Sequence, residues 1–211
     1  MKHHLRYTVA ALLIGVSGSA SATTLDDFDD EGLADEAGAP TAVLGGEAVG
    51  DEGNRIGSVH ELVIGDKGLV QEIVITRSPN NDLDQQYLEV PWSEVTFKPG
   101  LGEASLSFTA DEADKRSWLD LPPAIGASEW KVSRMIGMDV DSVDDVAQGE
   151  VENVLISEGT NDMSAYVIES EISDETFYAL PGDPSFVDYD DNELELPYTA
   201  ATLEDLPDLG Y

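Results

Sequence analysis

Gly53-Asn54-Arg55-Ile56-Gly57-Ser58-Val59-His60-Glu61-Leu62-Val63-Ile64 is the stretch of this 211-residue sequence that decides the fold. Its apolar positions 59, 62 and 64 are spaced by three residues and then by two. A regular strand alternates with a period of two, so this spacing predicts a strand with a β-bulge between Val59 and Leu62. Gly57 precedes the bulge and is expected where the backbone turns sharply or is closely approached.

The same pattern occurs a second time in the chain. Residues 148–156 repeat residues 56–64 at an offset of 92, with apolar side chains at 151, 154 and 156 and with Gly149 in the place of Gly57. Residues 177–181 repeat 87–91 at an offset of 90, and residues 196–199 repeat 106–109 at the same offset. Near-constant offsets in one order indicate a domain duplication and not a short solenoid repeat.

The segments around both copies are short β-rich runs separated by Gly, Asn and Asp turns. Such runs, with turns every eight to twelve residues, are typical of a small barrel or sandwich. We therefore predict an all-β protein with two tandem small β-barrels, at residues 43–109 and 130–207. Residues 110–129, which contain Leu121-Pro122-Pro123, are expected to form a short helical turn or a linker between them.

The first copy resembles the PRC-barrel family. The resemblance rests on the stretch quoted above, on Ile73-Val74-Ile75 and on Val90-Pro91-Trp92. It covers residues 43–109, whereas the second copy departs from the pattern, with Gln148 for the isoleucine and Gly182 for the tryptophan. The resemblance implies a compact β-barrel that docks onto other macromolecules and has no catalytic machinery of its own.

The N-terminus has the order of a secretory signal. Lys2 and Arg6 precede an apolar run over 8–16, and Ala20-Ser21-Ala22 supplies a small-x-small cleavage site. The run is shorter than the ~20 residues that a membrane span requires. We predict a signal peptide over 1–22, an acidic disordered segment over 23–42, a periplasmic or extracellular location, and no transmembrane segment after cleavage.

Composition narrows the classes of partner. The formal net charge is −34, and the sequence holds no cysteine. Phosphate backbones and anionic membranes require Lys and Arg, so we expect neither nucleic acid nor a membrane surface as a partner. Such acidity is typical of salt-adapted proteins, because molar salt shortens the range over which carboxylates repel each other.

No residue combination predicts a catalytic, cofactor or metal site. His60 is the only histidine after residue 22, so Ser-His-Asp and His-rich metal arrangements cannot form within one chain, and His60 is expected on a strand surface. The segment 139–145 with Glu150 has EF-hand spacing, but Asp144 stands where the sharp turn needs glycine. The aromatic side chains of Tyr87, Trp92 and Phe177 are expected in the barrel core or at its rim.

These observations favour an exported, non-enzymatic interaction or scaffold protein of the cell envelope. Its partner would be an envelope protein with a basic or apolar patch, and two linked barrels would reinforce each other's weak contacts. An acidic cation-binding or cation-buffering protein is the alternative, and a hydrolase is a third hypothesis. The sequence does not indicate an oligomeric state.

Overall fold

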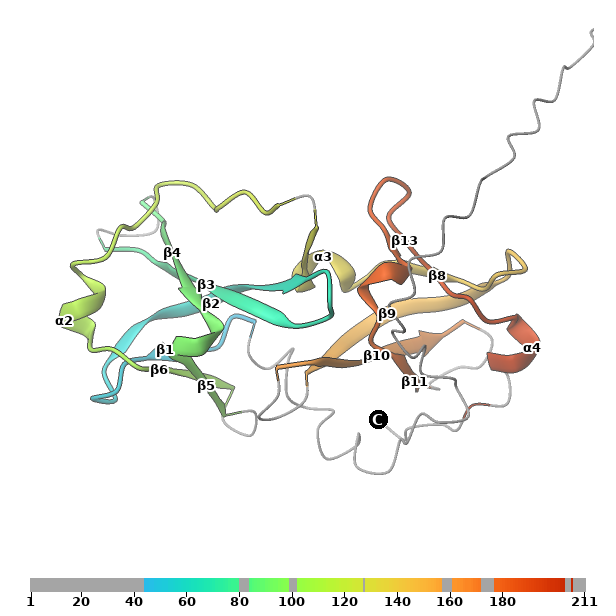
Figure 1. The fold of residues 1–211 in the computed structure, drawn as a ribbon, viewed down its shortest axis with the longest axis horizontal. Helices are drawn as coiled ribbons and strands as arrows, with labels where there is room; N and C mark the ends of the chain where they lie inside the picture. Colours follow the sequence, from blue (N-terminus) through green and yellow to red (C-terminus); the bar gives the residue numbers. More distant parts are fainter. Residues whose placement is uncertain are drawn as a thin grey trace, which may run out of the picture.

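The computed structural model describes residues 44–79, 84–98, 102–126, 128–156, 161–171, 177–203 and 206. The fold is mostly β, with one sheet of seven strands and one of six (Figure 1). The signal peptide and the acidic segment predicted over 1–42 lie outside the described residues. Within the described part of the chain, no helix is long and apolar enough to cross a membrane.

The N-terminal sheet has the strand order β4-β3-β2-β1-β6-β5, and β7 pairs with β2 outside this path. Its long central hairpin is antiparallel, whereas β1 and β6 are parallel. The elements of this half are β1 (Glu47–Val49), β2 (Arg55–Gly65), β3 (Val70–Arg77), β4 (Gln86–Pro91), η2 (Trp92–Glu94), β5 (Val95–Lys98), β6 (Glu103–Leu106), α2 (Ala110–Ala113) and β7 (Glu129–Lys131).

The C-terminal sheet has the order β11-β10-β9-β8-β13-β12, which is the same order of successive strands as in the first sheet. It also has an antiparallel central hairpin and one parallel pair, β8 with β13. Its elements are α3 (Val132–Met135), β8 (Asp139–Asp141), β9 (Ala147–Ile156), β10 (Met163–Ser170), β11 (Phe177–Pro181), η4 (Pro184–Phe186), β12 (Val187–Asp188), β13 (Glu193–Glu195) and α4 (Ala200–Leu203).

The predicted bulge is present in both central hairpins. In β2 the pairing with β3 shifts between Val59 and Glu61, and the equivalent shift in β9 leaves out Glu152. A bulge adds local twist, which lets a short sheet curl over its own core. The edge strands of each sheet are not paired with each other within the described residues, so closure of either sheet into a barrel is not observed there.

The two glycines ahead of the bulges lie where the backbone is closely approached, as the sequence predicts. A Cβ atom on Gly57 would lie 2.4 Å from the carbonyl oxygen of Thr76. One on Gly149 would lie 1.9 Å from the carbonyl oxygen of Glu169, and Gly149 also has φ of +146°. Both sites therefore exclude a side chain, and the second also disfavours any L-residue.

The predicted linker contains one helical turn and ends in a strand. Thr109 and Glu112 form a reciprocal capping box at the start of α2, which fixes the turn. At the other end, Glu129 belongs to β7, which pairs with Val63–Gly65 of β2. The last residues before the C-terminal sheet are thus part of the N-terminal sheet.

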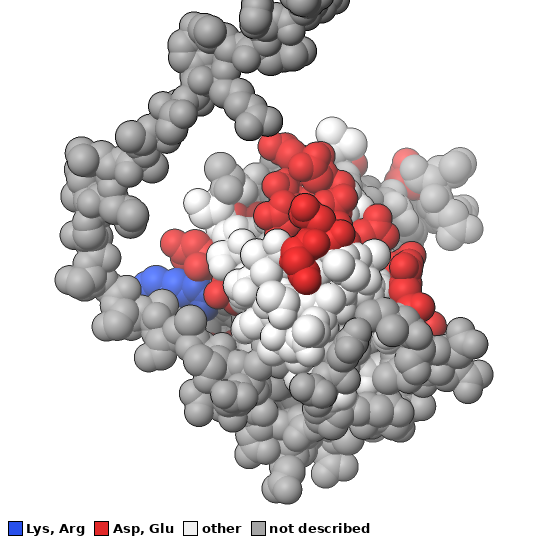
Figure 2. Space-filling model, turned by 90° about the vertical axis from the view of Figure 1, so that its right-hand side faces the viewer, with Lys and Arg blue, Asp and Glu red and all other residues white. Residues whose placement is uncertain are grey.

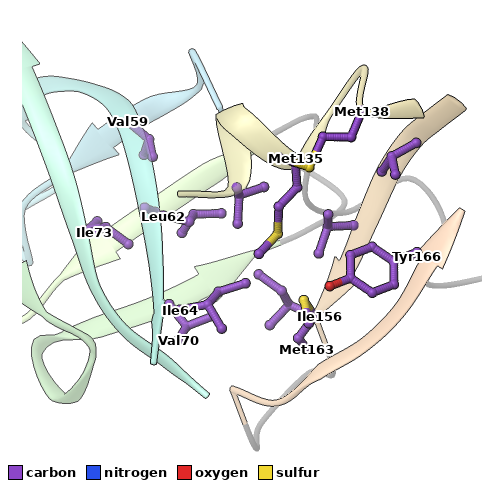
Figure 3. Close-up of a cluster of buried hydrophobic side chains, with 14 of the residues drawn as sticks. Val59, Leu62, Ile64, Val70, Ile73, Met135, Met138, Ile156, Met163 and Tyr166 are labelled. Atoms are coloured by element: carbon purple, nitrogen blue, oxygen red, sulfur yellow. The ribbon is translucent and has the colours of Figure 1, made fainter. Parts of the chain in front are cut away.

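The two sheets share one hydrophobic core. Side chains from both halves meet at the ends of the central hairpins, and the short helix α3 lies between them (Figure 3). The labelled members of this cluster are Val59, Leu62, Ile64, Val70, Ile73, Met135, Met138, Ile156, Met163 and Tyr166. Backbone bonds reinforce the contact, because Val70 N–H donates to Asn161 O at 2.9 Å and Met163 N–H to Gly68 O at 2.7 Å.

Candidate interaction surfaces

A buried carboxylate joins the two halves beside the shared core. Glu61 follows the bulge in β2 and is only 3% exposed. Its carboxylate accepts hydrogen bonds from the N–H of Leu62 at 3.1 Å and of Ser133 at 3.0 Å, and also from the Ser133 hydroxyl. Three donors compensate the lost hydration of the carboxylate, so this contact is structural and fixes α3 against β2.

The exposed face of β8 and β13 is strongly acidic. The parallel register places Glu193 beside Asp139 and Glu195 beside Asp141, whereas Val140 and Leu194 between them point into the core. Figure 2, which views the molecule from the side of the C-terminal half, shows acidic side chains gathered on this face. We call these four carboxylates the acidic face.

The carboxylates of the acidic face lie close enough to repel one another. The pKa of Glu193 is raised above its ordinary value, first by partial loss of hydration and then by four neighbouring carboxylates. These are Asp141, Asp191, Asp139 and Glu195. Like charges at this spacing repel each other, so a cation or a basic side chain would be attracted to this surface.

Charge is distributed very unevenly between the two halves. Residues 135–211 contain 21 Asp and Glu and neither Lys nor Arg, whereas residues 43–134 contain 16 Asp and Glu and 8 Lys and Arg. The equivalent surface of the N-terminal sheet carries Glu47 and Glu103 in register, and Arg55 lies 3.5 Å from Glu47. Within the described residues, no salt bridge reaches the four carboxylates of the acidic face, whereas Arg55 pairs with Glu47 on the equivalent N-terminal surface.

Four of the arginines make contacts within the N-terminal half or at the junction. Arg77 pairs with Asp114 at 2.5 Å and lies over Trp118, and Arg116 pairs with Glu94 at 2.5 Å and lies over Phe108. Arg55 lies near Glu47 and donates to the hydroxyl of Ser58, and Arg134 lies over the ring of Tyr189. Arginines stacked on rings and paired with carboxylates hold loops in place, and they do not form a basic stripe of the kind that binds nucleic acid.

Two open grooves lie in the N-terminal half. One, of about 450 Å³, runs along β1 and β6 past Asp51 and Glu103. The other, of about 440 Å³, lies between the start of β2 and the end of β3 and is flanked by Arg55 and Arg77. Both are open to solvent, and the second is lined mainly by polar atoms, unlike the enclosed, mostly apolar pockets that bind small molecules.

The residues that the sequence analysis considered as candidate site residues have structural roles in the fold. His60 is exposed on β2, with its ring 5.0 Å from that of Tyr87. Tyr87 is buried, and Trp92 and Phe177 are partly buried against apolar clusters, as expected for core or rim aromatics. The segment 139–145 forms β8 and the turn that follows it. Within the described residues, no group of three or more His, Cys, Asp or Glu could hold a metal.

Sequence reasoning missed two buried polar positions in the C-terminal half. Gln148, 1% exposed, replaces Ile56 and donates to the carbonyl oxygens of Val146 and Ala147. The hydroxyl of Tyr178 is buried without a hydrogen-bond partner in the structure, and burial raises its pKa. The substitution of Gln148 for an apolar residue was visible in the repeat, but its partners are local carbonyls that no sequence pattern identifies.

Comparison with protein-family models and with curated protein sequences finds no match for this chain.

Proposed function

We propose that this chain is an exported, salt-adapted interaction protein of the cell envelope, without catalytic activity, built from two tandem PRC-barrel-like domains. Support for the domain assignment comes from the common strand order, the paired bulges and the two glycines without space for a side chain. The N-terminal signal features support export. The functional part of the proposal rests on the acidic face.

The acidic face is the observation that carries the proposed function. Residues 135–211, with 21 Asp and Glu and no Lys or Arg, attract a basic surface at long range and repel acidic ones. Because the two sheets share a core, the partner meets one rigid body and not two barrels on a flexible linker. We therefore infer one basic partner protein, bound mainly through the C-terminal half.

The test compares two variants of equal charge change. In the first, the acidic face is neutralised by Asp139→Asn, Asp141→Asn, Glu193→Gln and Glu195→Gln. In the control, four exposed carboxylates of the N-terminal half are neutralised by Asp51→Asn, Glu52→Gln, Asp66→Asn and Asp111→Asn. Each protein is used to capture partners from an envelope extract at two salt concentrations.

We expect wild type and control to retain the same basic protein and the acidic-face variant to lose it. Retention by all three proteins would overturn the assignment to the acidic face. Retention by wild type and control should weaken in parallel at the higher salt concentration, because the Debye length shortens.

Cation buffering remains the second candidate, and the raised pKa of Glu193 is the observation that favours it. Calcium titration by calorimetry separates the two. If the protein buffers cations, many carboxylates should bind calcium weakly, and the acidic-face variant should bind less calcium only in proportion to the charge it has lost. If the protein instead binds a basic partner, low concentrations of calcium should not change partner capture.

A further inference from the structure

The groove between the start of β2 and the end of β3 carries positive charge in a strongly acidic chain. The sequence holds 44 Asp and Glu against 10 Lys and Arg, yet no Asp or Glu is among the described residues that line this groove of about 440 Å³. The lining side chains that carry nitrogen or oxygen are Arg55, Ser58, Thr76, Arg77, Ser78 and Gln85. The groove therefore combines two cations with neutral hydrogen-bonding groups.

The C-terminal half has no counterpart of these two arginines. Counted from the bulges, Arg55 corresponds to Ala147 and Arg77 corresponds to Ser170. The sheet framework that both halves share therefore does not require a cation at either position. In Figure 1, β2 begins and β3 ends on the side of the N-terminal half that faces away from the C-terminal half, so the groove and the acidic face are separate surfaces.

The guanidinium of Arg55 is held in place but keeps free donors. Its Nε donates to Gly57 O at 3.3 Å, and its Nη2 donates to the Ser58 hydroxyl at 2.8 Å. Glu47 lies 3.5 Å from the same Nε, and the two side chains are 60% and 63% exposed, so this ion pair is loose. Among the described residues, Nη1 of Arg55 has no hydrogen-bond partner. Because a guanidinium has five N–H donors, Arg55 can still bind an anion.

The guanidinium of Arg77 is fixed more firmly. Its Nε donates to the side-chain oxygen of Gln86 at 3.3 Å, its Nη1 pairs with Asp114 at 2.5 Å, and its plane lies 3.7 Å from the ring centroid of Trp118. Its Nη2 has no hydrogen-bond partner in the described part of the chain. A donor that is already oriented loses little conformational entropy when it binds a ligand.

Two hydroxyls lie between the arginines. Ser58 and Thr76 are directly opposite each other in the β2–β3 register, and both line the groove. The Oγ1 atom of Thr76 is buried and has no hydrogen-bond partner in the structure. A buried hydroxyl without a partner destabilises the fold, so an acceptor beside it would be favourable.

We propose that this groove binds a small oxyanion from solution, a carboxylate or a phosphate. The free Nη groups of Arg55 and Arg77 donate to its oxygens, and the hydroxyls of Ser58 and Thr76 add neutral hydrogen bonds. Forked N–H donors match the oxygens of these anions, and such charge-assisted bonds do not need the apolar enclosure that neutral ligands require. This inference does not rest on the proposed function, since it uses no residue of the acidic face.

The test titrates the full chain with sodium succinate and, separately, with sodium phosphate, with sodium chloride at equal ionic strength as the reference. The readout is the NMR signals of the backbone amides of Ser58 and Thr76 and of the Nε–H groups of the arginines. We expect these signals to shift with saturation at one site. Tighter binding of succinate would identify a carboxylate as the natural ligand, and tighter binding of phosphate would identify a phosphate.

Arg55→Gln is the decisive variant, because Arg55 is exposed and its loss leaves the contacts of Arg77 in place. It should weaken binding of the preferred anion by about tenfold or more. Lys67→Gln is the matched control, since it removes the same charge from an exposed turn at the other end of the β2–β3 hairpin. It should change the affinity by less than about twofold, because it alters only the distant field.

Two results would overturn the proposal. One is the absence of saturable binding of either succinate or phosphate to the wild-type chain. The other is equal weakening by Arg55→Gln and Lys67→Gln, which would mean attraction by the general field and not by this groove. The variant with a neutralised acidic face should bind the oxyanion at least as tightly as wild type, so failure of the basic-partner proposal and failure of this one are distinguishable.

Discussion

Glu61 and Ser133 are 72 residues apart in sequence, and the buried carboxylate of Glu61 accepts a hydrogen bond from the hydroxyl of Ser133, which lies at the surface. The same carboxylate also accepts the Ser133 N–H, at the start of the short helix α3. This pair holds the beginning of the C-terminal half against the central strand of the N-terminal half. Its removal should therefore weaken the whole molecule and not one sheet alone.

Glu61→Ala should lower the free energy of unfolding by about 1–3 kcal/mol, because the buried N–H of Leu62 loses its acceptor and the two bonds to Ser133 are lost. Ser133→Ala should cost less, about 1–2 kcal/mol, since the backbone bond remains. Urea unfolding measures both. Glu52→Ala, at an exposed position, is the control and should change stability by less than about 0.5 kcal/mol.

Tyr178→Phe should leave stability unchanged or raise it by about 1–2 kcal/mol, because the buried hydroxyl has no partner and its removal ends a desolvation cost. Tyr166→Phe is the matched comparison. Its hydroxyl donates to the carbonyl oxygen of Asp183 at 3.0 Å, so its loss should destabilise by about 1 kcal/mol. The melting temperature of Tyr166→Phe should therefore be clearly lower than that of Tyr178→Phe. A large loss of stability in Tyr178→Phe would contradict the absence of a hydrogen-bond partner for its hydroxyl.

Gly149→Ala should be more damaging than Gly57→Ala, although both replace a glycine ahead of a bulge. At Gly149 a Cβ would lie 1.9 Å from a backbone oxygen and φ is +146°, whereas at Gly57 the contact is 2.4 Å. Each should cost at least about 2 kcal/mol. Gly53→Ala is the control with positive φ and no atom within 4 Å, and it should cost only about 1 kcal/mol.

Raising NaCl from roughly 0.1 M to 1 M should raise the melting temperature, because the Debye length falls about threefold. The pKa values of Glu193 and Glu72 are raised in the folded state, by lost hydration and by nearby carboxylates. A raised folded pKa means that stability is lost as pH rises through it. At low salt, stability should therefore increase as pH falls from 7 towards the ordinary value of 4.5, and this gain should shrink in 1 M NaCl. A melting temperature that does not respond to salt would contradict this account.

The central hairpins were predictable because their apolar spacing is local. Val59 and Leu62 both face the core but are three residues apart, which a regular strand of period two does not allow without a bulge. The glycine ahead of them indicates a place where another backbone segment approaches closely. Strand β7 was not predictable, since Glu129–Lys131 is too short to show a period and pairs only because β2 offers an edge. Likewise, nothing in the local sequence distinguishes Glu61 from the other acidic residues among the 44, because Ser133, which donates hydrogen bonds to it, is distant in the sequence.

The pairing of β7 with β2 also affects what happens when the backbone is cut. A protease that cleaves near Ala124 would produce a C-terminal piece whose first strand is still built into the other piece's sheet. The two pieces would remain associated through this strand and the common interior. We therefore expect two separately produced polypeptides, divided at this point, to associate and restore the native assembly.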